Sequence, residues 1–447
     1  MLSHVKEPER VQSVASETAV LVRVVQRNQA FIEEPVEELK GLATTAGTQV
    51  AASLVQRREV PDRATYLGRG KVEELKQVVD SHGADVVIFD NDLSPAQTRN
   101  LEKALGVKVI DRTELILDIF ASRARTHEAR LAVELAQLEY SLPRLKRMWT
   151  HLSRLKMGVG MRGPGEKQLE VDRRLVEKRI HDLRSELKVI EARKQRQVAA
   201  RRDHMTVSLV GYTNAGKSTL MNALTEAGVV VENKLFATLD TRTRRWQLPN
   251  WGPVLLSDTV GFIRDLPHRL IASFKATLEE ARRADLLLHV ADASNRAVYD
   301  QISAVYAVLE EIGIEEKHTL LVINKIDLVA SASTLSGILN RYPNAIPISA
   351  EQRTGFEQLA HRVSDALSQT FRDVDVETSI ENGRLMAYLA NYGEVLSKRY
   401  EDGRAIIHCR IPQKYLGRIN DPDTTIRLRD AEPPAGTGDE QTIEEVA

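Results

Sequence analysis

The chain has 447 residues, which is too long for one ordinary hydrophobic core, so we expect two to four domains. Hydrophobic residues make up 42% of the chain and charged residues 28%, which indicates packed domains and excludes a collagen-like or broadly disordered protein. The formal net charge is −1, and the single cysteine, Cys409, excludes a disulfide framework and indicates a buried structural thiol within an apolar run.

The sequence carries no signal for export or for insertion into a membrane. Residues 1–17 are polar and of mixed charge, and no stretch approaches the roughly 18 apolar residues that a spanning helix needs. We therefore expect a soluble, cytoplasmic protein, with a monomer as the default state.

Residues 17–124 are expected to form a small α/β domain. Continuous apolar runs predict buried strands, helical patterns lie between them, and this alternation is typical of a parallel sheet. The expected strands are 19–25, 84–89 and 107–110, and the expected helices are 71–81 and 95–105.

Residues 125–202 are expected to form an antiparallel helical hairpin. Leucines recur at alternating spacings of four and three before a glycine-rich stretch, and apolar residues do the same after it, which is typical of a coiled-coil seam. The first row is Leu131, Leu135, Leu138, Leu142 and Leu145, and the second is Val176, Ile180, Leu183, Leu187 and Ile190. Pro143 is expected to kink the first helix.

The loop expected at residues 157–167 contains four glycines and one proline, and basic residues flank it. Residues 143–202 hold 18 Lys and Arg against 7 Asp and Glu, an excess of 11, so the rest of the chain carries −12. Such segregation indicates either a nucleic-acid surface or a solvated helical face, and the loop is either an RNA-contacting tip or an exposed linker. We favour RNA contact, because a basic tip with few side chains can approach a phosphate backbone closely. The expected contacts are Arg154, Lys156, Arg162 and Lys167.

Residues 203–370 contain a phosphate-binding loop in the context that it requires. An expected strand, 207–210, runs into G-x-x-x-x-G-K-S at Gly211–Ser218, and a helical pattern follows. The glycines let backbone N–H groups converge on phosphate at a helix N-terminus. Lys217 is expected to bind the β- and γ-phosphates, and the Ser218 hydroxyl to bind Mg²⁺.

Three further elements discriminate among P-loop proteins, and two of them favour guanine as the base. Asp258-Thr259-Val260-Gly261 follows an expected strand, so that Asp258 can hold Mg²⁺ and Gly261 can approach the γ-phosphate. Asn324-Lys325-Ile326-Asp327 follows another, and the Asp327 carboxylate suits the donors of guanine, which adenine lacks. Ser349-Ala350 follows a third, with backbone groups suited to the guanine O6.

A mobile segment before Asp258 is expected to supply a threonine to Mg²⁺ when the γ-phosphate is present, and composition leaves Thr238, Thr241 and Thr243 as candidates. Phe262 occupies the position where many GTPases have a glutamine that orients the attacking water. We therefore expect slow intrinsic hydrolysis, with the water placed by another residue or a partner.

Residues 373–430 are expected to form a small α+β domain in the order β-α-β-β-α-β, which suits a ferredoxin-like fold, and residues 431–447 to form a disordered acidic tail. The predicted fold class is thus α/β: a P-loop GTPase domain preceded by a small α/β domain and a long antiparallel helical hairpin, and followed by a small α+β domain.

The five nucleotide motifs resemble those of the translation-factor-related GTPases. Beyond them the chain resembles the HflX family of the Obg-HflX group, from about Tyr66 through the GTPase domain. The resemblance rests on Gly68–Lys71, Asp92–Gln97, Val109–Thr113, Val133–Leu138, Arg162–Glu166 and Phe236–Asp240. The chain departs from the family at the hairpin tip, which has fewer glycines, and at Lys167, where threonine is expected.

The resemblance implies a GTPase that binds the large ribosomal subunit near the peptidyl-transferase centre and splits stalled or idle ribosomes, with hydrolysis stimulated by the ribosome. It implies Thr238 as the threonine that binds Mg²⁺, so that the expected metal ligands are Ser218, Thr238 and Asp258, and the expected catalytic residues are Lys217, Thr238 and Gly261. The full expected nucleotide site is Gly211, Tyr212, Thr213, Asn214, Ala215, Gly216, Lys217, Ser218, Thr219, Phe236, Ala237, Thr238, Leu239, Asp240, Asp258, Thr259, Val260, Gly261, Asn324, Lys325, Asp327, Ser349, Ala350 and Glu351.

The family is also credited with ATP binding by its N-terminal domain. Gly68-Arg69-Gly70-Lys71 could bind an anion there, although ordinary turn chemistry is the better interpretation. Two alternatives to the ribosome-splitting function stay open: a nucleotide-gated adaptor at a membrane or stress complex, and a ribosome-assembly GTPase.

Overall fold

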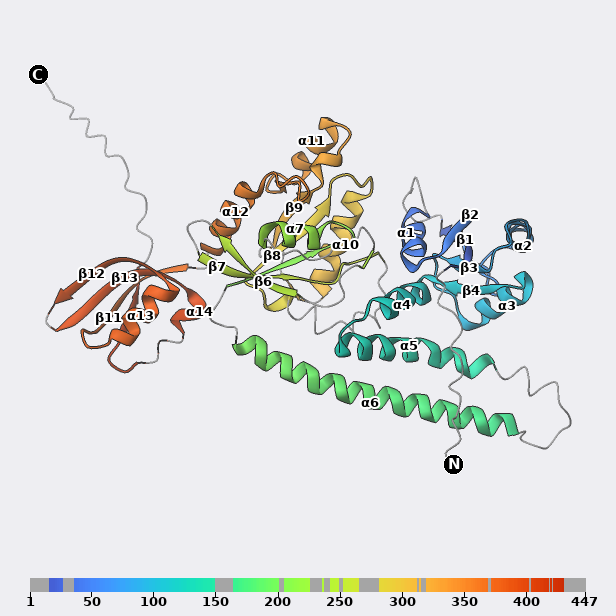
Figure 1. Ribbon diagram of the computed structural model, residues 1–447, viewed down its shortest axis with the longest axis horizontal. Coiled ribbons are helices and arrows are strands. Elements are labelled where there is room, and N and C mark those ends of the chain that lie inside the picture. Colours follow the sequence, from blue (N-terminus) through green and yellow to red (C-terminus); the bar gives the residue numbers. More distant parts are fainter. Residues whose placement is uncertain are drawn as a thin grey trace, which may run out of the picture. The chain divides into compact units, whose positions relative to one another are not determined.

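The computed structural model describes fourteen stretches of the chain, which form two compact units (Figure 1). Unit 1 comprises residues 1–248 and 252–359, and unit 2 comprises residues 249–251 and 360–447. The described residues are 16–26, 36–148, 164–200, 205–225, 235–236, 242–248, 252–264, 281–311, 313–314, 319–368, 371–401, 403–417, 419 and 421–429. Within these stretches, no helix combines the length and the apolar character needed to cross a membrane.

Unit 1 begins with a four-stranded sheet in the order β2-β1-β3-β4, in which every pairing is parallel, as predicted. Its strands are β1 (Thr18–Gln26), β2 (Gln49–Arg58), β3 (Val86–Phe89) and β4 (Lys108–Asp111). The strand β2 was not predicted from the sequence. The helices between and after them are α1 (Glu37–Ala46), α2 (Arg69–His82), α3 (Pro95–Leu105) and α4 (Arg112–Arg123).

Local capping determines where two of these helices begin. At α3, the Ser94 side chain accepts from the Gln97 N–H while the Gln97 side chain accepts from the Ser94 N–H, and Pro95 occupies the first turn. At α4, the Asp111 carboxylate accepts from the Glu114 N–H at 2.9 Å. Asp111 is 2% exposed and also faces the helical hairpin, as described below.

The hairpin consists of α5 (His127–Met148) and α6 (Pro164–Ala200), which pack against each other through the predicted apolar rows (Figure 1). Leu131, Leu135, Ile180 and Leu183 form its buried core. Ion pairs from Arg179 to Glu134 and from Arg184 to Glu139 cross the pair. The predicted loop was too long at its C-terminal end, because α6 already begins at Pro164, a residue suited to a first helical turn.

The nucleotide-binding part of unit 1 contains a six-stranded sheet in the order β10-β9-β8-β5-β7-β6. All its pairings are parallel except that of β6 with β7, which the sequence analysis did not anticipate. The strands are β5 (Thr206–Gly211), β6 (Arg242–Leu248), β7 (Gly252–Asp258), β8 (Leu286–Asp292), β9 (Thr319–Asn324) and β10 (Ile346–Pro347). The helices are α7 (Lys217–Thr225), α10 (Val298–Glu311), η3 (Ile326–Leu328), α11 (Ala332–Arg341) and α12 (Phe356–Ser368), the last of which spans the boundary between the units.

Unit 2 continues with an antiparallel sheet in the order β12-β13-β11-β14, and its element order is the predicted β-α-β-β-α-β. Its elements are β11 (Phe371–Ser379), α13 (Gly383–Tyr392), β12 (Glu394–Glu401), β13 (Arg404–Pro412), α14 (Gln413–Leu416) and β14 (Thr425–Leu428). Cys409 of β13 is fully buried, and burial raises the pKa of its thiol to about 11, so it is an unreactive core residue as expected. The predicted tail, 431–447, lies outside the described residues.

Candidate guanine-nucleotide site

The phosphate-binding loop connects the end of β5 to α7, and neighbouring atoms leave no room for a Cβ at two of its glycines. Gly211 has φ 148°, and a Cβ there would lie 2.2 Å from the carbonyl oxygen of Val290. Gly216 has φ 92°, and a Cβ would lie 2.3 Å from the Asn324 side-chain nitrogen. A side chain at either position would be strained by the positive φ and would displace the Val290 backbone or the Asn324 side chain.

Lys217 begins α7 and points back into the loop. Its Nζ donates to the carbonyl oxygens of Gly211 (3.0 Å) and Tyr212 (2.9 Å), and the residue is 6% exposed. Burial lowers the pKa of Lys217 to about 8, an effect that nearby Asp258 opposes. A cation held this way is placed for an anionic ligand at the loop.

Ser218 and Asp258 bring two oxygen ligands together from different elements. The Ser218 Oγ donates to Asp258 Oδ2 at 2.6 Å, across the start of α7 and the end of β7. Hydroxyl and carboxylate oxygens at a phosphate site are the donor set that Mg²⁺ takes in nucleotide sites, so these two residues fit that ion. Thr238, expected as a third ligand, lies outside the described residues, as do Ala237, Leu239 and Asp240.

The segment after Asp258 is attached to the phosphate-binding loop through its backbone. The Thr213 N–H donates to the Phe262 carbonyl (2.7 Å), and the Phe262 N–H donates to the Gly211 carbonyl (3.0 Å). A Cβ on Gly261 would lie 2.8 Å from Thr213 Cα and 3.1 Å from Lys217 Nζ, so the chain passes too close for a side chain. Phe262 itself is 3% exposed and packs in the core, where it offers no polar group to a water molecule.

On the other side of the site, Asn324 connects three loops. Its Nδ2 donates to the Ala215 carbonyl (2.9 Å) and its Oδ1 accepts from the Ala350 N–H (3.0 Å). Lys325 adopts φ 61° and its Nζ pairs with Asp292 at 2.7 Å. Asp327 Oδ1 is buried and, among the described residues, accepts no hydrogen bond, so its hydrogen-bonding capacity is unused within that part of the chain.

The structure thus gathers the described part of the predicted site at the carboxyl ends of β5, β7, β9 and β10. Tyr212, Thr213, Ala215, Thr259, Ser349 and Ala350 are buried there, Thr219 and Val260 lie beside them, and Asn214 and Glu351 are exposed. The Thr259 hydroxyl donates to the Leu209 carbonyl of β5 and so ties the segment after β7 to the sheet. Phe236 is 1% exposed, and its N–H donates to the Thr213 hydroxyl (2.8 Å).

Of the four predicted RNA contacts, the structure describes only the backbone of one. Arg154, Lys156 and Arg162 lie outside the described residues, and Lys167 lies in the first turns of α6 rather than in the loop. At the turn before α2, the Gly68 N–H donates to the Gln56 side chain of β2 (3.1 Å), so this N–H is used within the protein.

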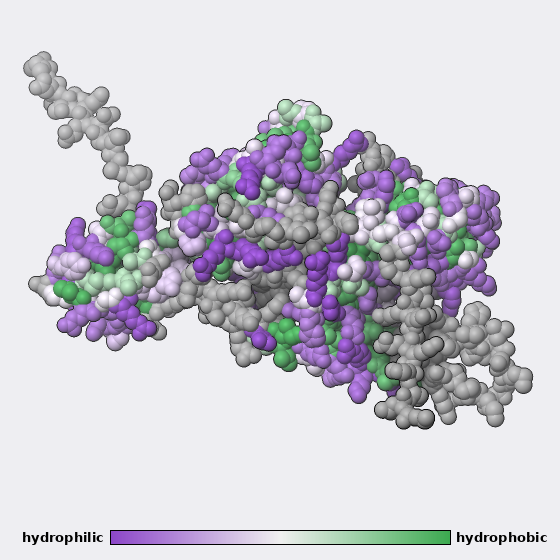
Figure 2. Space-filling view, in the orientation of Figure 1, coloured by the Kyte–Doolittle hydropathy of each residue, from purple (hydrophilic) through white to green (hydrophobic). Residues whose placement is uncertain are grey.

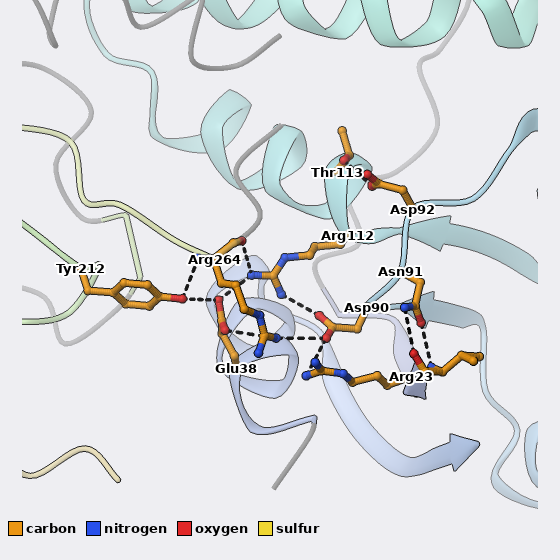
Figure 3. Close-up of polar contacts among 10 residues, drawn as sticks. Arg23, Glu38, Asp90, Asn91, Asp92, Arg112, Thr113, Tyr212 and Arg264 are labelled. Atoms are coloured by element: carbon orange, nitrogen blue, oxygen red, sulfur yellow. Dashed lines mark hydrogen bonds and ion pairs between the residues drawn. The ribbon is translucent and has the colours of Figure 1, made fainter. Parts of the chain in front are cut away.

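Two features of the site were not predicted from the sequence. Asp292, at the end of β8, holds Lys325, and a carboxylate at the end of an apolar run was the available signal. Glu38, Arg112 and Arg264 form polar contacts with Tyr212 or its neighbours and connect the N-terminal domain to the site (Figure 3). No spacing rule connects residues so far apart in the chain.

Three family descriptions match successive parts of the chain. Residues 33–121 match "GTP-binding GTPase N-terminal", residues 123–201 match "GTP-binding GTPase Middle Region", and residues 206–325 match "50S ribosome-binding GTPase". A GTP-binding protein from Sulfolobus solfataricus, solved with GDP, is 26% identical with a TM-score of 0.42, covering 79% of this chain and 99% of its own.

Curated relatives match over almost their whole length. GTPase HflX of Escherichia coli (strain K12) is 45% identical over 403 residues, which are 89% of this chain and 94% of that protein. GTPase HflX of Magnetococcus marinus is 46% identical over 86% of this chain and 89% of that protein. Together with the P-loop fold, these matches show that the chain belongs to the HflX family of GTPases and is a GTP-binding GTP hydrolase.

Proposed function

We propose that this chain binds GTP with the residues gathered above and hydrolyses it in response to the ribosome. Lys217 and the backbone N–H groups from Asn214 to Thr219 hold the β- and γ-phosphates. The unpartnered Asp327 oxygen accepts from guanine, and the Ser349–Glu351 backbone meets the base on its other edge. Asn324 holds the loops that bear these groups at a fixed spacing.

Ser218, Asp258 and Thr238 are the proposed Mg²⁺ ligands, and when bound the ion would neutralise phosphate charge. Gly261 places its N–H near the γ-phosphate. Glycine is needed there because its backbone passes close to Thr213 and Lys217, where a side chain would not fit. Phe262 offers no group that could orient water, so hydrolysis by the free protein is slow and depends on a partner.

We further propose that the partner is the large ribosomal subunit, bound near the peptidyl-transferase centre, and that the protein splits stalled or idle ribosomes in the cytoplasm as a monomer. The observation that carries this proposal is the match of residues 206–325 to the 50S ribosome-binding GTPases. The excess of 11 basic over acidic residues in 143–202 supports it, because such a region on a long hairpin suits a phosphate backbone.

A membrane-bound adaptor would need a broad apolar surface. Figure 2 shows hydrophilic residues predominating over the described surface on the face drawn, with hydrophobic residues in smaller groups. No broad apolar surface of that kind is seen among the described residues on this face, and the basic excess in residues 143–202 is the feature that favours RNA. Ribosome assembly is the remaining alternative, and it predicts binding to immature rather than mature subunits.

The test is GTP hydrolysis by the purified protein alone and with mature large subunits, with residues 158–167 intact or deleted. The proposal expects strong stimulation that requires these residues, together with separation of 70S particles into subunits. Hydrolysis that mature subunits leave unchanged would overturn the ribosomal part, and the adaptor would then be the first alternative. A charge-reversed variant, Arg162→Glu with Lys167→Glu, serves as a second arm that keeps the loop length.

A further inference from the structure

A buried polar cluster joins the N-terminal domain to residues 261–264, which lie against the phosphate-binding loop (Figure 3). The Tyr212 hydroxyl donates to Glu38 Oε1 (2.8 Å) and accepts from the Arg264 N–H (2.7 Å). The Arg112 guanidinium donates to the Arg264 carbonyl oxygen (3.0 Å), to Glu38 and to Asp90 (2.6 Å). Both backbone polar groups of Arg264 are therefore held by side chains that belong to, or bind to, the N-terminal domain.

The hydrogen bonds to the Arg264 backbone matter for the nucleotide site, because Arg264 lies only three residues after Gly261. The backbone between them is also fixed at Phe262, which bonds to Gly211 and Thr213 of the phosphate-binding loop. Segment 261–264 therefore runs between two anchors: the phosphate-binding loop at one end and the N-terminal domain at the other. A displacement of the N-terminal domain at Arg264 would therefore be transmitted to Gly261, because only two residues separate them.

The buried Arg112 guanidinium balances the charge of two carboxylates in this cluster. Its side chain is 4% exposed and lies between the carboxylates of Glu38 and Asp90, while Arg23 and Arg264 complete the ion pairs of those two acids. Burial alone would raise the pKa of the Glu38 carboxyl, but Arg112 and Arg264 outweigh that effect and hold it below its usual value. Loss of the guanidinium would leave two acids incompletely paired and the Arg264 carbonyl without its donor.

The segment before the sheet's edge strand is held by the same domain. The Leu235 N–H donates to the Thr45 hydroxyl of α1 (3.2 Å), and the Phe236 ring packs edge-to-face on Phe120 of α4, with centroids 4.7 Å apart. Phe236 also donates its N–H to Thr213 of the phosphate-binding loop. Residues 235–236 and residues 261–264 thus both contact α1 or α4.

The residue next to Arg112 holds the hairpin. Asp111 Oδ1 accepts from the Tyr140 hydroxyl (2.7 Å), and Asp111 Oδ2 accepts from Arg144 (2.8 Å), both from α5. The Arg144 guanidinium also covers the Tyr140 ring at 3.5 Å and donates to the Leu93 carbonyl. Two consecutive residues at the β4–α4 junction therefore bind the hairpin with one side chain and the segment 261–264 with the other.

We propose that Arg112 and Tyr212 are positioning residues for GTP hydrolysis, and that the Asp111–Arg112 pair couples a displacement of the hairpin to the conformation of residues 261–264. The coupling path runs from α5 through Tyr140 and Asp111 to Arg112, and from there to the Arg264 backbone. Its link to ribosome stimulation rests on the function proposed above, whereas the coupling inside the free protein does not.

The first test uses hydrogen exchange in the free protein with GDP bound. Arg112→Gln and Tyr140→Phe are each expected to raise exchange in peptides covering 258–264 by about tenfold, because each removes a hydrogen bond from the path. Thr113→Val is the matched control: Thr113 lies in the same turn, but its hydroxyl bonds to Asp92 within the N-terminal domain (2.8 Å). Unchanged exchange at 258–264 in both path variants would overturn the coupling.

The second test measures GTP hydrolysis with and without large subunits. Tyr140→Phe lies far from the nucleotide in the path and is expected to leave basal kcat and KM within about twofold, while lowering the stimulation by about tenfold. Arg112→Lys keeps the positive charge but cannot donate to Glu38, Asp90 and the Arg264 carbonyl at once. Its stimulation by large subunits is expected to lie between that of Arg112→Gln and that of the unmodified chain. Equal stimulation of Tyr140→Phe and the unmodified chain would contradict the coupling.

The two tests separate the two proposals. If the unmodified chain is not stimulated by large subunits, the ribosomal function fails, and hydrogen exchange still decides the coupling. If Arg112→Gln does not fold, Tyr140→Phe and Arg112→Lys carry the test, because both leave the buried charges paired.

Discussion

The amide of Asn324 donates to the carbonyl oxygen of Ala215 at 2.9 Å, which joins the loop after β9 to the phosphate-binding loop. Asn324 is 1% exposed, and its Oδ1 holds the Ala350 N–H, so both of its polar atoms are used within the protein. The role of this asparagine is therefore to set the distance between loops. We propose that base selection falls to Asp327, whose buried Oδ1 accepts no bond from the described residues.

Asp327→Asn should change the base that the site prefers. An amide has one acceptor and one donor where the carboxylate has two acceptors, so it fits a base with a carbonyl at C2, as in xanthine, better than guanine. We expect affinity for GTP to fall by about 100-fold or more and affinity for XTP to rise. Competition binding with the two nucleotides measures both, and an unchanged order of preference would contradict the assignment of Asp327.

Gly261→Ala should impair hydrolysis without unfolding the protein. The added Cβ would lie 2.8 Å from Thr213 Cα, so the segment must move away from the phosphate-binding loop. A displacement of this kind typically lowers kcat/KM by about 100-fold. Gly70→Ala is the control, because nothing lies within 4 Å of a Cβ there and alanine suits the interior of α2. Steady-state hydrolysis that is equal in both variants would show that residue 261 tolerates a side chain.

Glu114→Gln should stabilise the protein at high pH only. Burial, with Asp111 and Asp118 nearby, raises the pKa of Glu114 from 4.5 to about 7. Below pH 4.5 both folded and unfolded chains hold the proton; between pH 4.5 and 7 only the folded chain does, so stability falls as pH rises through this window. The loss above pH 7 is at most roughly 3 kcal/mol.

Glutamine is neutral throughout, so the variant should unfold at a higher temperature than the unmodified chain at pH 8 and at nearly the same temperature at pH 5. Thermal unfolding at the two pH values measures this. A shift of the same size at both would mean that Glu114 is ionised in the fold.

Leu183→Ala should loosen the hairpin. Leu183 is fully buried in the seam between α5 and α6, and a leucine truncated in a core typically costs about 2–5 kcal/mol. Val189→Ala on the same helix is the control, because Val189 is 68% exposed and should cost less than about 0.5 kcal/mol. Hydrogen exchange in α5 and α6 reports the difference, and similar exchange in the two variants would contradict the packing.

The sequence by itself determined the parts of this protein that depend on short-range spacing. Gly211–Ser218, Asp258–Gly261 and Asn324–Asp327 each combine strand, turn and helix chemistry within a few residues, so their order was enough to predict a guanine-nucleotide site. The apolar rows of the hairpin were equally readable, because a seam repeats with the period of the helix.

The tertiary structure decided what lies between these parts. Glu38 and Tyr212 are 174 positions apart, and Arg112 and Arg264 are 152 apart, so no local pattern could pair them. β6 likewise contains exposed arginines rather than an alternating apolar pattern, and only its pairing with β7 makes it a strand. Burial of charged side chains depends on which distant partners surround them, and the folded arrangement alone supplies those partners.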